Sequence, residues 1–391
     1  MAKSWDEINA RIAAGEAVVM TAEEFAGLAA DEGVSEAARR VDVVTTGTFG
    51  PMCSSGAVLN FGHSDPPIRM AEIWLNDVMA YGGLAAVDTY IGVTQPSCTR
   101  GMEYGGAHVI EDLLRGRAVH LRASSYGTDC YPRTDIDTWV KLEDLNQAYF
   151  FNPRNAYQNY AVAVNTGDRA IYTYLGTLLP HLGNATYCSA GALSPLLNDP
   201  TYRTIGVGSR IFVAGAPGYV AWEGTQHNPS QERDANGVPV KPAGTIAVTA
   251  DLKRASTRFF SAATMTGYGT SAFVGVGIPI PVLDEDLAVT LALTDADITA
   301  TIFDYGVPRR SRPALGQVTY AELRSGSITI DGKRVPTGPI SSLPKAREIA
   351  AELKRWIVEE RFTLNEPAQT LPGPDSGQTQ KPLEIRSEEA I

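Results

Sequence analysis

Four cysteines, Cys53, Cys98, Cys130 and Cys188, are the side chains of this 391-residue chain best suited to covalent chemistry. None belongs to a C-x-x-C pair, and no histidine stands at zinc-finger spacing, so the sequence predicts no metal site. In a reducing compartment all four are expected to be free thiols. Because a packed, inert thiol is the ordinary state of a cysteine, reactivity has to be argued from the neighbours of each one.

Cys130 lies in a polar segment, residues 124–133, that follows a strand-like run. Arg122 and Arg133 would lower the pKa of its thiol, whereas Asp129 would oppose them. Structural cysteines usually have apolar neighbours, so the polar surroundings favour a reactive thiol here.

Cys53 lies in a glycine-rich loop, residues 46–56, directly after an apolar run at residues 41–45. Such a loop can turn several N–H groups inward, and a nest of N–H groups stabilises a thiolate. A small buried residue in a tight turn would have the same sequence, so both interpretations stay open. Cys98 and Cys188 fit packed positions better.

Polar side chains outside the cysteine segments supply two further candidates. His227, in a Gly/Pro-containing polar loop, is a candidate general acid or base. Arg309, Arg310 and Arg312 follow one another closely in an acidic protein and are predicted to bind a carboxylate substrate. A solvated basic loop is the alternative for the arginines.

The pattern of elements predicts a mixed fold, α/β or α+β, whose sheet topology the sequence leaves open. Residues 1–366 are expected to form one large glycine-rich domain ending in a hairpin at residues 327–335 and a helix at about 343–361. Capping boxes at Ser4 and Thr21 predict two N-terminal helices. Further helices are expected after Asp65 through residue 79 and in three segments, 167–179, 251–263 and 283–293. The polar tail, residues 367–391, is expected to be disordered or loosely attached.

Composition excludes several functional classes. The formal net charge is -11 without any basic run, which argues against nucleic-acid binding and against anionic membranes. Neither a signal peptide nor an uninterrupted apolar span is evident, so a cytoplasmic protein is expected. The G-x-G-x-x-A match at residues 267–272 precedes a strand-like run instead of a helix, so no bound dinucleotide is predicted.

Five long segments resemble the homocysteine biosynthesis family. They are TTGTFGPMCSSGAVLNFGHSDPPIRM, RIFVAGAPGYVAWEGTQHNP, GVGIPIPVLDEDLA, DYGVPRRSRP and ITIDGKRVPTGPISSL, and the resemblance extends over residues 41–366. It implies a sulfurtransferase that carries sulfur as a cysteine persulfide and delivers it to aspartate semialdehyde, giving homocysteine. Two family cysteines correspond to Cys53 and Cys130; the persulfide is expected on Cys130, with Cys53 as its partner thiol.

The resemblance also implies a small ferredoxin-like partner. Converting an aldehyde to a thiol consumes electrons, and no tightly bound cofactor is predicted, so this iron–sulfur partner or a dithiol is expected to supply them. Archaeal members often carry C-terminal CBS domains, which this sequence does not include. The sequence does not decide whether the protein forms an oligomer. The alternative function is a noncatalytic persulfide carrier or sulfur-assembly scaffold, which would need a reactive cysteine and no aldehyde site.

Overall fold

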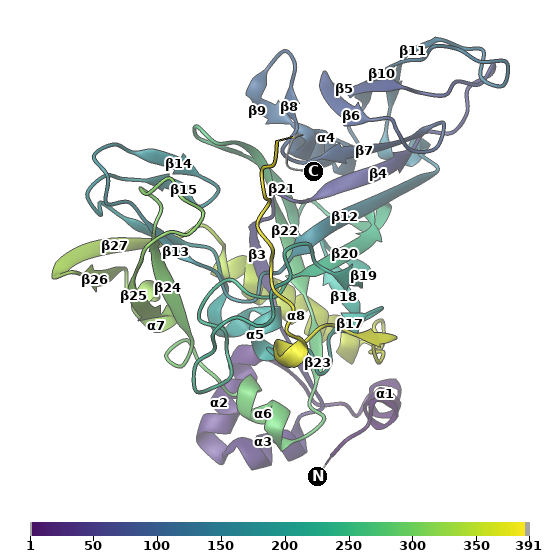
Figure 1. The fold of residues 1–391 in the computed structure, drawn as a ribbon. Helices are drawn as coiled ribbons and strands as arrows, with labels where there is room; N and C mark the ends of the chain where they lie inside the picture. Colours follow the sequence, from purple (N-terminus) through teal and green to yellow (C-terminus); the bar gives the residue numbers. More distant parts are fainter. Residues whose placement is uncertain (1, 388–391) are drawn as a thin grey trace.

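The computed structural model describes residues 2–387 and contains two main sheets with helices packed around them (Figure 1). The larger sheet lies at the right and centre of the view and the smaller at the left. Below both lie helices α2 (Ala22–Glu32), α3 (Val34–Arg40) and α6 (Glu285–Leu291). The predicted mixed α/β class is confirmed. None of the helices in residues 2–387 has the length and apolar character needed to cross a membrane.

The larger sheet has 15 strands within the described residues, and its strand pairs are antiparallel. In spatial order its main path is β11 (Asp135–Val140), β10 (Val119–Ser124), β5 (Glu72–Leu75), β6 (Val78–Tyr81), β7 (Asp88–Gly92), β4 (Gly56–Asn60), β12 (Gln147–Asn155), β20 (Ile246–Asp251), β19 (Ala216–Glu223), β18 (Arg210–Val213), β22 (Gly269–Gly277) and β21 (Phe260–Met265). Three strands lie off this path: β3 (Thr48–Pro51) pairs with β22, β8 (Pro96–Ser97) pairs with β6, and β9 (Gly101–Gly105) pairs with β8.

Alternation of side chains explains why this sheet forms. In β10, Val119, Leu121 and Ala123 are buried, whereas His120 and Arg122 lie on the other, more open face. Successive side chains of a strand point to opposite faces, so one face packs on the core and the other meets solvent. The expected strands that became β7, β10, β13, β18, β20 and β24 are confirmed.

The smaller sheet has six strands and mixes parallel with antiparallel pairs. Its order is β25 (Ala314–Thr319), β24 (Thr299–Asp304), β13 (Val162–Val164), β16 (Ala185–Tyr187), β27 (Lys333–Pro339) and β26 (Ser327–Ile330). The predicted hairpin at its edge is confirmed, with Asp331 and Gly332 both at positive φ, as a type I′ turn requires.

Three short sheets complete the strands of the described chain. They are β1 (Val19–Thr21), β2 (Val43–Thr45) and β23 (Pro279–Pro281); β14 (Ile171–Thr173) and β15 (Gly176–Leu178); and β17 (Gly206–Val207) and β28 (Gln369–Thr370). The helices are α1 (Trp5–Ala13), α2 (Ala22–Glu32), α3 (Val34–Arg40), α4 (Gly106–Leu114), α5 (Pro195–Asn198), α6 (Glu285–Leu291), α7 (Tyr320–Arg324) and α8 (Leu343–Val358), with 3-10 turns η1 (Leu142–Asp144), η2 (Gly191–Leu193), η3 (Leu252–Arg254) and η4 (Pro374–Ser376).

Local signals located several helices correctly. Both capping boxes form, at Ser4 before α1 and at Thr21 before α2. The expected helices at the sites of α6 and α8 are also confirmed. Helix α8 buries an apolar stripe against β3 and β22, and it passes so close to Gly47 that an added Cβ would lie 2.2 Å from the Ala346 carbonyl oxygen.

The helix predicted after Asp65 is wrong, because the segment forms the β5–β6 hairpin. Ile73, Leu75, Val78 and Ala80 are buried, and this period of two belongs to a strand. Asn76 and Asp77 supply the tight turn with positive φ. Two other helix predictions are also wrong: residues 171–178 form the β14–β15 hairpin, and residues 251–263 form η3 and the start of β21. In all three, pairing with a neighbouring strand outweighed helix propensity.

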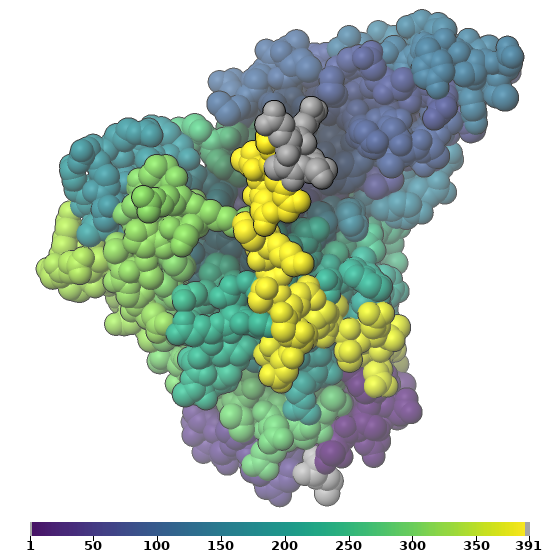
Figure 2. All heavy atoms as spheres, in the orientation of Figure 1, coloured from purple at the N-terminus to yellow at the C-terminus, as the bar shows by residue number. Residues whose placement is uncertain are grey.

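The tail makes more contacts than its polar composition suggests. Strand β28 pairs with β17, Leu371 is buried in the main core, and the Pro372 carbonyl lies 2.9 Å from His227 Nε2. Figure 2 shows the described part of the tail, in yellow, lying along the surface between the two sheets. Residues 388–391 lie outside the described part of the chain.

Candidate functional site

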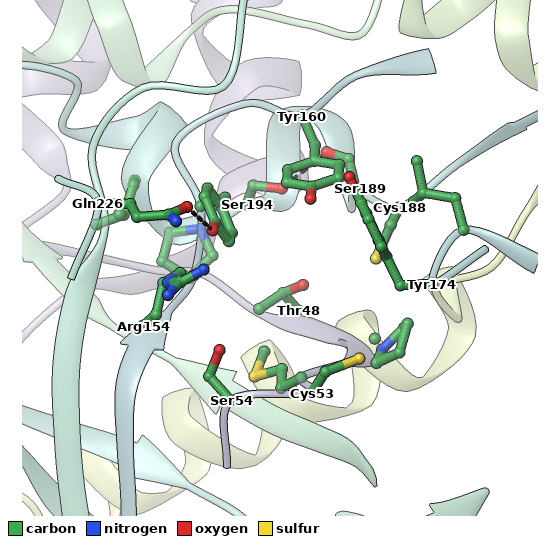
Figure 3. A pocket seen from close by; sticks show the side chains of 18 of the residues that line it. Thr48, Cys53, Ser54, Arg154, Tyr160, Tyr174, Cys188, Ser189, Ser194 and Gln226 are labelled. Carbon is green, nitrogen blue, oxygen red and sulfur yellow. Dashed lines mark hydrogen bonds between the residues drawn. The ribbon is translucent and has the colours of Figure 1, made fainter. Parts of the chain in front are cut away.

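A cavity of about 400 Å³ lies where the two sheets meet (Figure 3). The end of β3 and the turn after it form one wall, and segments leading to and from the smaller sheet form the opposite wall. Its lining residues are Thr48, Gly50, Pro51, Met52, Cys53, Ser54, Arg154, Ala156, Tyr157, Tyr160, Tyr174, Leu175, Cys188, Ser189, Ser194, Pro195, Leu196, Gln226 and Tyr268. Two of the four cysteines therefore face one enclosed space.

Cys53 occupies the turn that follows β3. The Ser55 N–H donates to the Met52 carbonyl and closes this turn. Strand β3 pairs with β22, so the turn brings the Cys53 sulfur to 3.1 Å from Ser271 Oγ. The Tyr268 side chain lines the same cavity, and the nearby Cys53 contributes to the raised pKa of its phenol. The Ser271 hydroxyl is thus placed to donate to a thiolate at Cys53.

Cys188 follows β16 and faces the same cavity from the other wall. A methyl group added to Gly50 would lie 2.9 Å from its sulfur, so the thiol packs directly on β3. Burial, with a smaller contribution from the charge of Cys53, raises the pKa of Cys188 to about 12. Cys188 therefore stays a neutral thiol at physiological pH and is a poor nucleophile.

Tyrosines form much of the remaining wall. Burial raises the pKa of Tyr157, Tyr160 and Tyr268, so their phenols remain protonated at neutral pH. Tyr174 packs edge-on against both Tyr160 and Tyr268, and its hydroxyl lies 2.9 Å from that of Tyr305. The cavity therefore offers several neutral hydroxyl donors around one half-buried thiol.

Arg154 is the one positively charged residue among those that line the cavity. It stands near the end of β12, and its Nε donates to Thr225 Oγ1 at 3.1 Å. This contact holds the guanidinium through Nε, and Arg154 also interacts with Tyr157 in the same lining. A guanidinium so placed suits a carboxylate.

Cys130 lies away from this cavity, on an exposed loop between β10 and β11. The arginines expected beside it are engaged elsewhere: Arg133 donates to the carbonyls of Asp65 and Pro66, and Arg122 pairs with Asp77. The structure therefore brings Cys53 together with Cys188 in the cavity, and not with Cys130. Cys98 is likewise exposed on another loop.

His227 is buried beside the cavity without lining it. Its Nδ1 lies 2.9 Å from the Thr245 carbonyl oxygen, and its Nε2 lies 2.9 Å from that of Pro372. The Thr245 N–H also donates to Nδ1 at 3.0 Å, which leaves Nε2 to donate to the Pro372 carbonyl, so the imidazole ties the tail to the body of the protein. Its neighbour Gln226 lines the cavity instead.

The three arginines of the 309–312 loop also stand outside the cavity lining. Arg312 lies over the ring of Tyr305, 3.9 Å from its centroid, and Arg310 donates to Gln380 of the tail. Arg309 is exposed. Arg312 thus reaches the site only through Tyr305, which contacts Tyr174. Sequence reasoning missed Arg154 and the tyrosines; their one signal was the cluster Arg154, Tyr157 and Tyr160 after an apolar run.

Comparison with known proteins assigns this architecture to a family. Residues 17–364 match the model of a family described as "Homocysteine biosynthesis enzyme, sulfur-incorporation". The chain belongs to the homocysteine biosynthesis family. The resemblance drawn from the sequence motifs is therefore confirmed, and the matched region includes both sheets and every residue of the cavity.

Two relatives within this family carry a functional name, L-aspartate semialdehyde sulfurtransferase. The protein from Methanosarcina acetivorans is 52% identical over 379 residues, which cover 97% of this chain and 74% of the relative. The protein from Methanocaldococcus jannaschii is 50% identical over 398 residues, which cover 98% of this chain and 76% of the relative. An uncharacterized protein from Methanothermobacter thermautotrophicus is 30% identical over 332 residues, 82% of this chain and 72% of its own length. No solved structure matches the chain.

Proposed function

We propose that this family member is an L-aspartate semialdehyde sulfurtransferase that delivers persulfide sulfur to the aldehyde carbon and forms L-homocysteine. The observation that carries the proposal is the cavity in which the half-buried thiol of Cys53 faces hydroxyl donors and a single arginine. The names of the two relatives about half identical to this chain support the choice of substrate. We place the activity in the cytoplasm, where reducing conditions keep thiols free.

Cys53 is the thiol that delivers the sulfur in this proposal. A persulfide on Cys53 would extend into the cavity, whereas a persulfide on exposed Cys130 would meet solvent. Cys188, whose pKa is raised to about 12, lacks the thiolate needed to take up sulfur. The carrier role that the sequence favoured for Cys130 therefore passes to Cys53.

Arg154 binds the α-carboxylate of the substrate in this proposal. A guanidinium can form two parallel hydrogen bonds to a carboxylate. The arginines at 309, 310 and 312 were expected to do this, but they lie outside the cavity lining. Arg154 would bind the carboxylate end of a short amino-acid aldehyde, and Cys53 at another wall would face its aldehyde end.

The reaction needs electrons that the cavity does not supply. Two electrons cleave the bond between Cys53 and the transferred sulfur, and two more reduce the carbon from the aldehyde to the thiol level. We propose a reduced iron–sulfur protein, such as a small ferredoxin-like partner, or a dithiol as their source. Exposed Cys130 is accessible to an external sulfur donor or reductant, which is the role that its position supports.

The test is homocysteine formation by the purified protein. The protein is incubated with polysulfide as the sulfur donor, aspartate semialdehyde and a dithiol reductant, and homocysteine is measured by mass spectrometry. The proposal expects turnover with the wild type and none with Cys53→Ser. Labelling of Cys53 without any homocysteine would instead support the noncatalytic persulfide carrier.

A further inference from the structure

Tyr268 stands at the tip of the β21–β22 hairpin, where the larger sheet reaches over the cavity. The neighbouring Gly267 has φ +65°, and a Cβ added there would lie 2.6 Å from the ring of Tyr172 on β14. The tip therefore packs against the β14–β15 hairpin. This contact fixes the tip beside the cavity, whose lining Tyr268 shares with Cys53.

The surroundings of Tyr268 keep its phenol protonated at neutral pH. Burial, followed by the charge and hydrogen bond of Cys53, raises its pKa to about 12. The Tyr174 ring packs edge-on against it, and Tyr174 is itself held by Tyr305 under Arg312. The residue nevertheless remains 37% exposed, so its other side can exchange protons with water.

We propose that Tyr268 is the general acid that protonates the aldehyde oxygen when sulfur bound to Cys53 adds to the carbonyl carbon. This inference rests on the proposed function. In the step, the terminal sulfur of the persulfide anion forms a bond to carbon and the C=O π bond breaks. The phenol proton moves to the oxygen, giving an uncharged adduct, Cys53–S–S–CH(OH)–R, and a Tyr268 phenolate. Water then reprotonates the phenolate, and no electrons enter or leave.

The other candidate donors fit this role less well. Ser271 also contacts the Cys53 sulfur, but it is fully buried behind the thiol and does not line the cavity. Arg154 cannot give up a proton at physiological pH. Cys188 is neutral but packs on β3 at the opposite wall. Of the four tyrosines that line the cavity with Cys53, Tyr268 is the one that is exposed to solvent; Tyr157, Tyr160 and Tyr174 are more buried.

The experiment separates loading of sulfur from its discharge. Wild type, Tyr268→Phe and Tyr172→Phe are loaded with polysulfide, and the added sulfur on Cys53 is quantified by mass spectrometry. Aspartate semialdehyde is then added without reductant, and formation of the Cys53 adduct is followed with time. Tyr172→Phe is the matched control because it removes a hydroxyl from the same hairpin contact, outside the cavity lining.

We expect all three proteins to load equally and Tyr268→Phe to form the adduct at least about 100-fold more slowly, the usual loss for a general acid. Tyr172→Phe should match the wild type. Adduct formation by Tyr268→Phe at the wild-type rate would overturn the inference and leave the proposed function standing. A Tyr268→Phe protein that cannot be loaded would also overturn it, because Tyr268 would then act before the aldehyde.

A second measurement needs no variant. Transfer of the phenol proton in the slow step should make adduct formation by the wild type slower in heavy water than in ordinary water. An equal rate in both solvents would count against Tyr268 as the acid. A wild-type protein that never carries the added sulfur on Cys53 would overturn the proposed function itself, and this inference with it.

Discussion

Cys53 and Cys130 both follow a strand of the larger sheet, yet the two loops have opposite surroundings. The Cys53 turn lies where the second sheet packs against the first, so tyrosines and Arg154 enclose it. The Cys130 loop joins β10 to β11, the last strand of the sheet, and the residue is exposed. The polar, arginine-flanked segment around Cys130 therefore forms a surface loop, whereas the glycine-rich segment around Cys53 forms part of the cavity wall.

The Cys53 turn differs because segments leading to and from the smaller sheet form a second wall opposite it. Gly47 lets α8 approach the start of β3, and Cys188 packs on the same strand from the other side. Cys130 is exposed, and the arginines near it in the chain bind backbone carbonyls and Asp77 instead of the thiol. Enclosure, and not the charge of adjacent residues, distinguishes the two thiols.

The largest expected effect is the difference in activity between variants of Cys53 and of Cys130. Cys53→Ser should reduce homocysteine formation by at least about 1,000-fold, since loss of a covalent carrier removes the pathway altogether. The Cys130→Ser variant should still transfer sulfur already loaded on Cys53 to the aldehyde, because Cys130 lies outside the cavity. Single-turnover assays with polysulfide-loaded protein measure both. The opposite ranking would return the carrier role to Cys130.

The next effect compares the two thiols that share the cavity. Only the thiolate is alkylated, and the pKa of Cys188, about 12, keeps it protonated up to strongly alkaline pH. At pH 8 iodoacetamide should label Cys188 about 1,000-fold more slowly than exposed Cys130. Peptide mapping of the folded protein measures the rates, and labelling of the urea-unfolded protein is the control. Equally fast labelling of Cys188 would show that the wall it occupies is open.

A smaller effect distinguishes the cavity arginine from the surface arginines. Arg154→Lys keeps the charge but loses the planar fork, so the KM for aspartate semialdehyde should rise about 10-fold. Arg310→Lys is the matched control, because Arg310 contacts the tail and not the cavity. Steady-state kinetics provides the measurement. A raised KM for the Arg310 variant alone would restore the 309–312 loop as the carboxylate site.

The smallest effect concerns the tail. Ending the chain after Glu366 removes β28, buried Leu371 and the carbonyl that faces His227. Burying one leucine contributes about 2 kcal/mol, so the thermal midpoint should fall by a few degrees. Calorimetry of the truncated protein measures this shift, and Leu371→Ala should reproduce most of it. An unchanged midpoint would mean that the tail is only loosely attached.

Local sequence signals by themselves determined several elements. The Ser4 and Thr21 capping boxes, the Asp331–Gly332 turn and the apolar stripe of α8 all depend on residues close in the chain. The family motifs likewise identified the family. Hydrogen bonds and turn dihedrals within a few residues decide such features, so the sequence specifies them without reference to the rest of the fold.

Tertiary structure alone decided which thiol is enclosed. The cavity is lined by residues far apart in the chain, and only the meeting of the two sheets brings together Cys53, Arg154, Cys188 and Tyr268. The β5–β6 hairpin was missed for a related reason, since pairing with β10 and β7 stabilises it more than local propensity does. Burial depends on which surfaces pack together, and that information is spread over the whole chain.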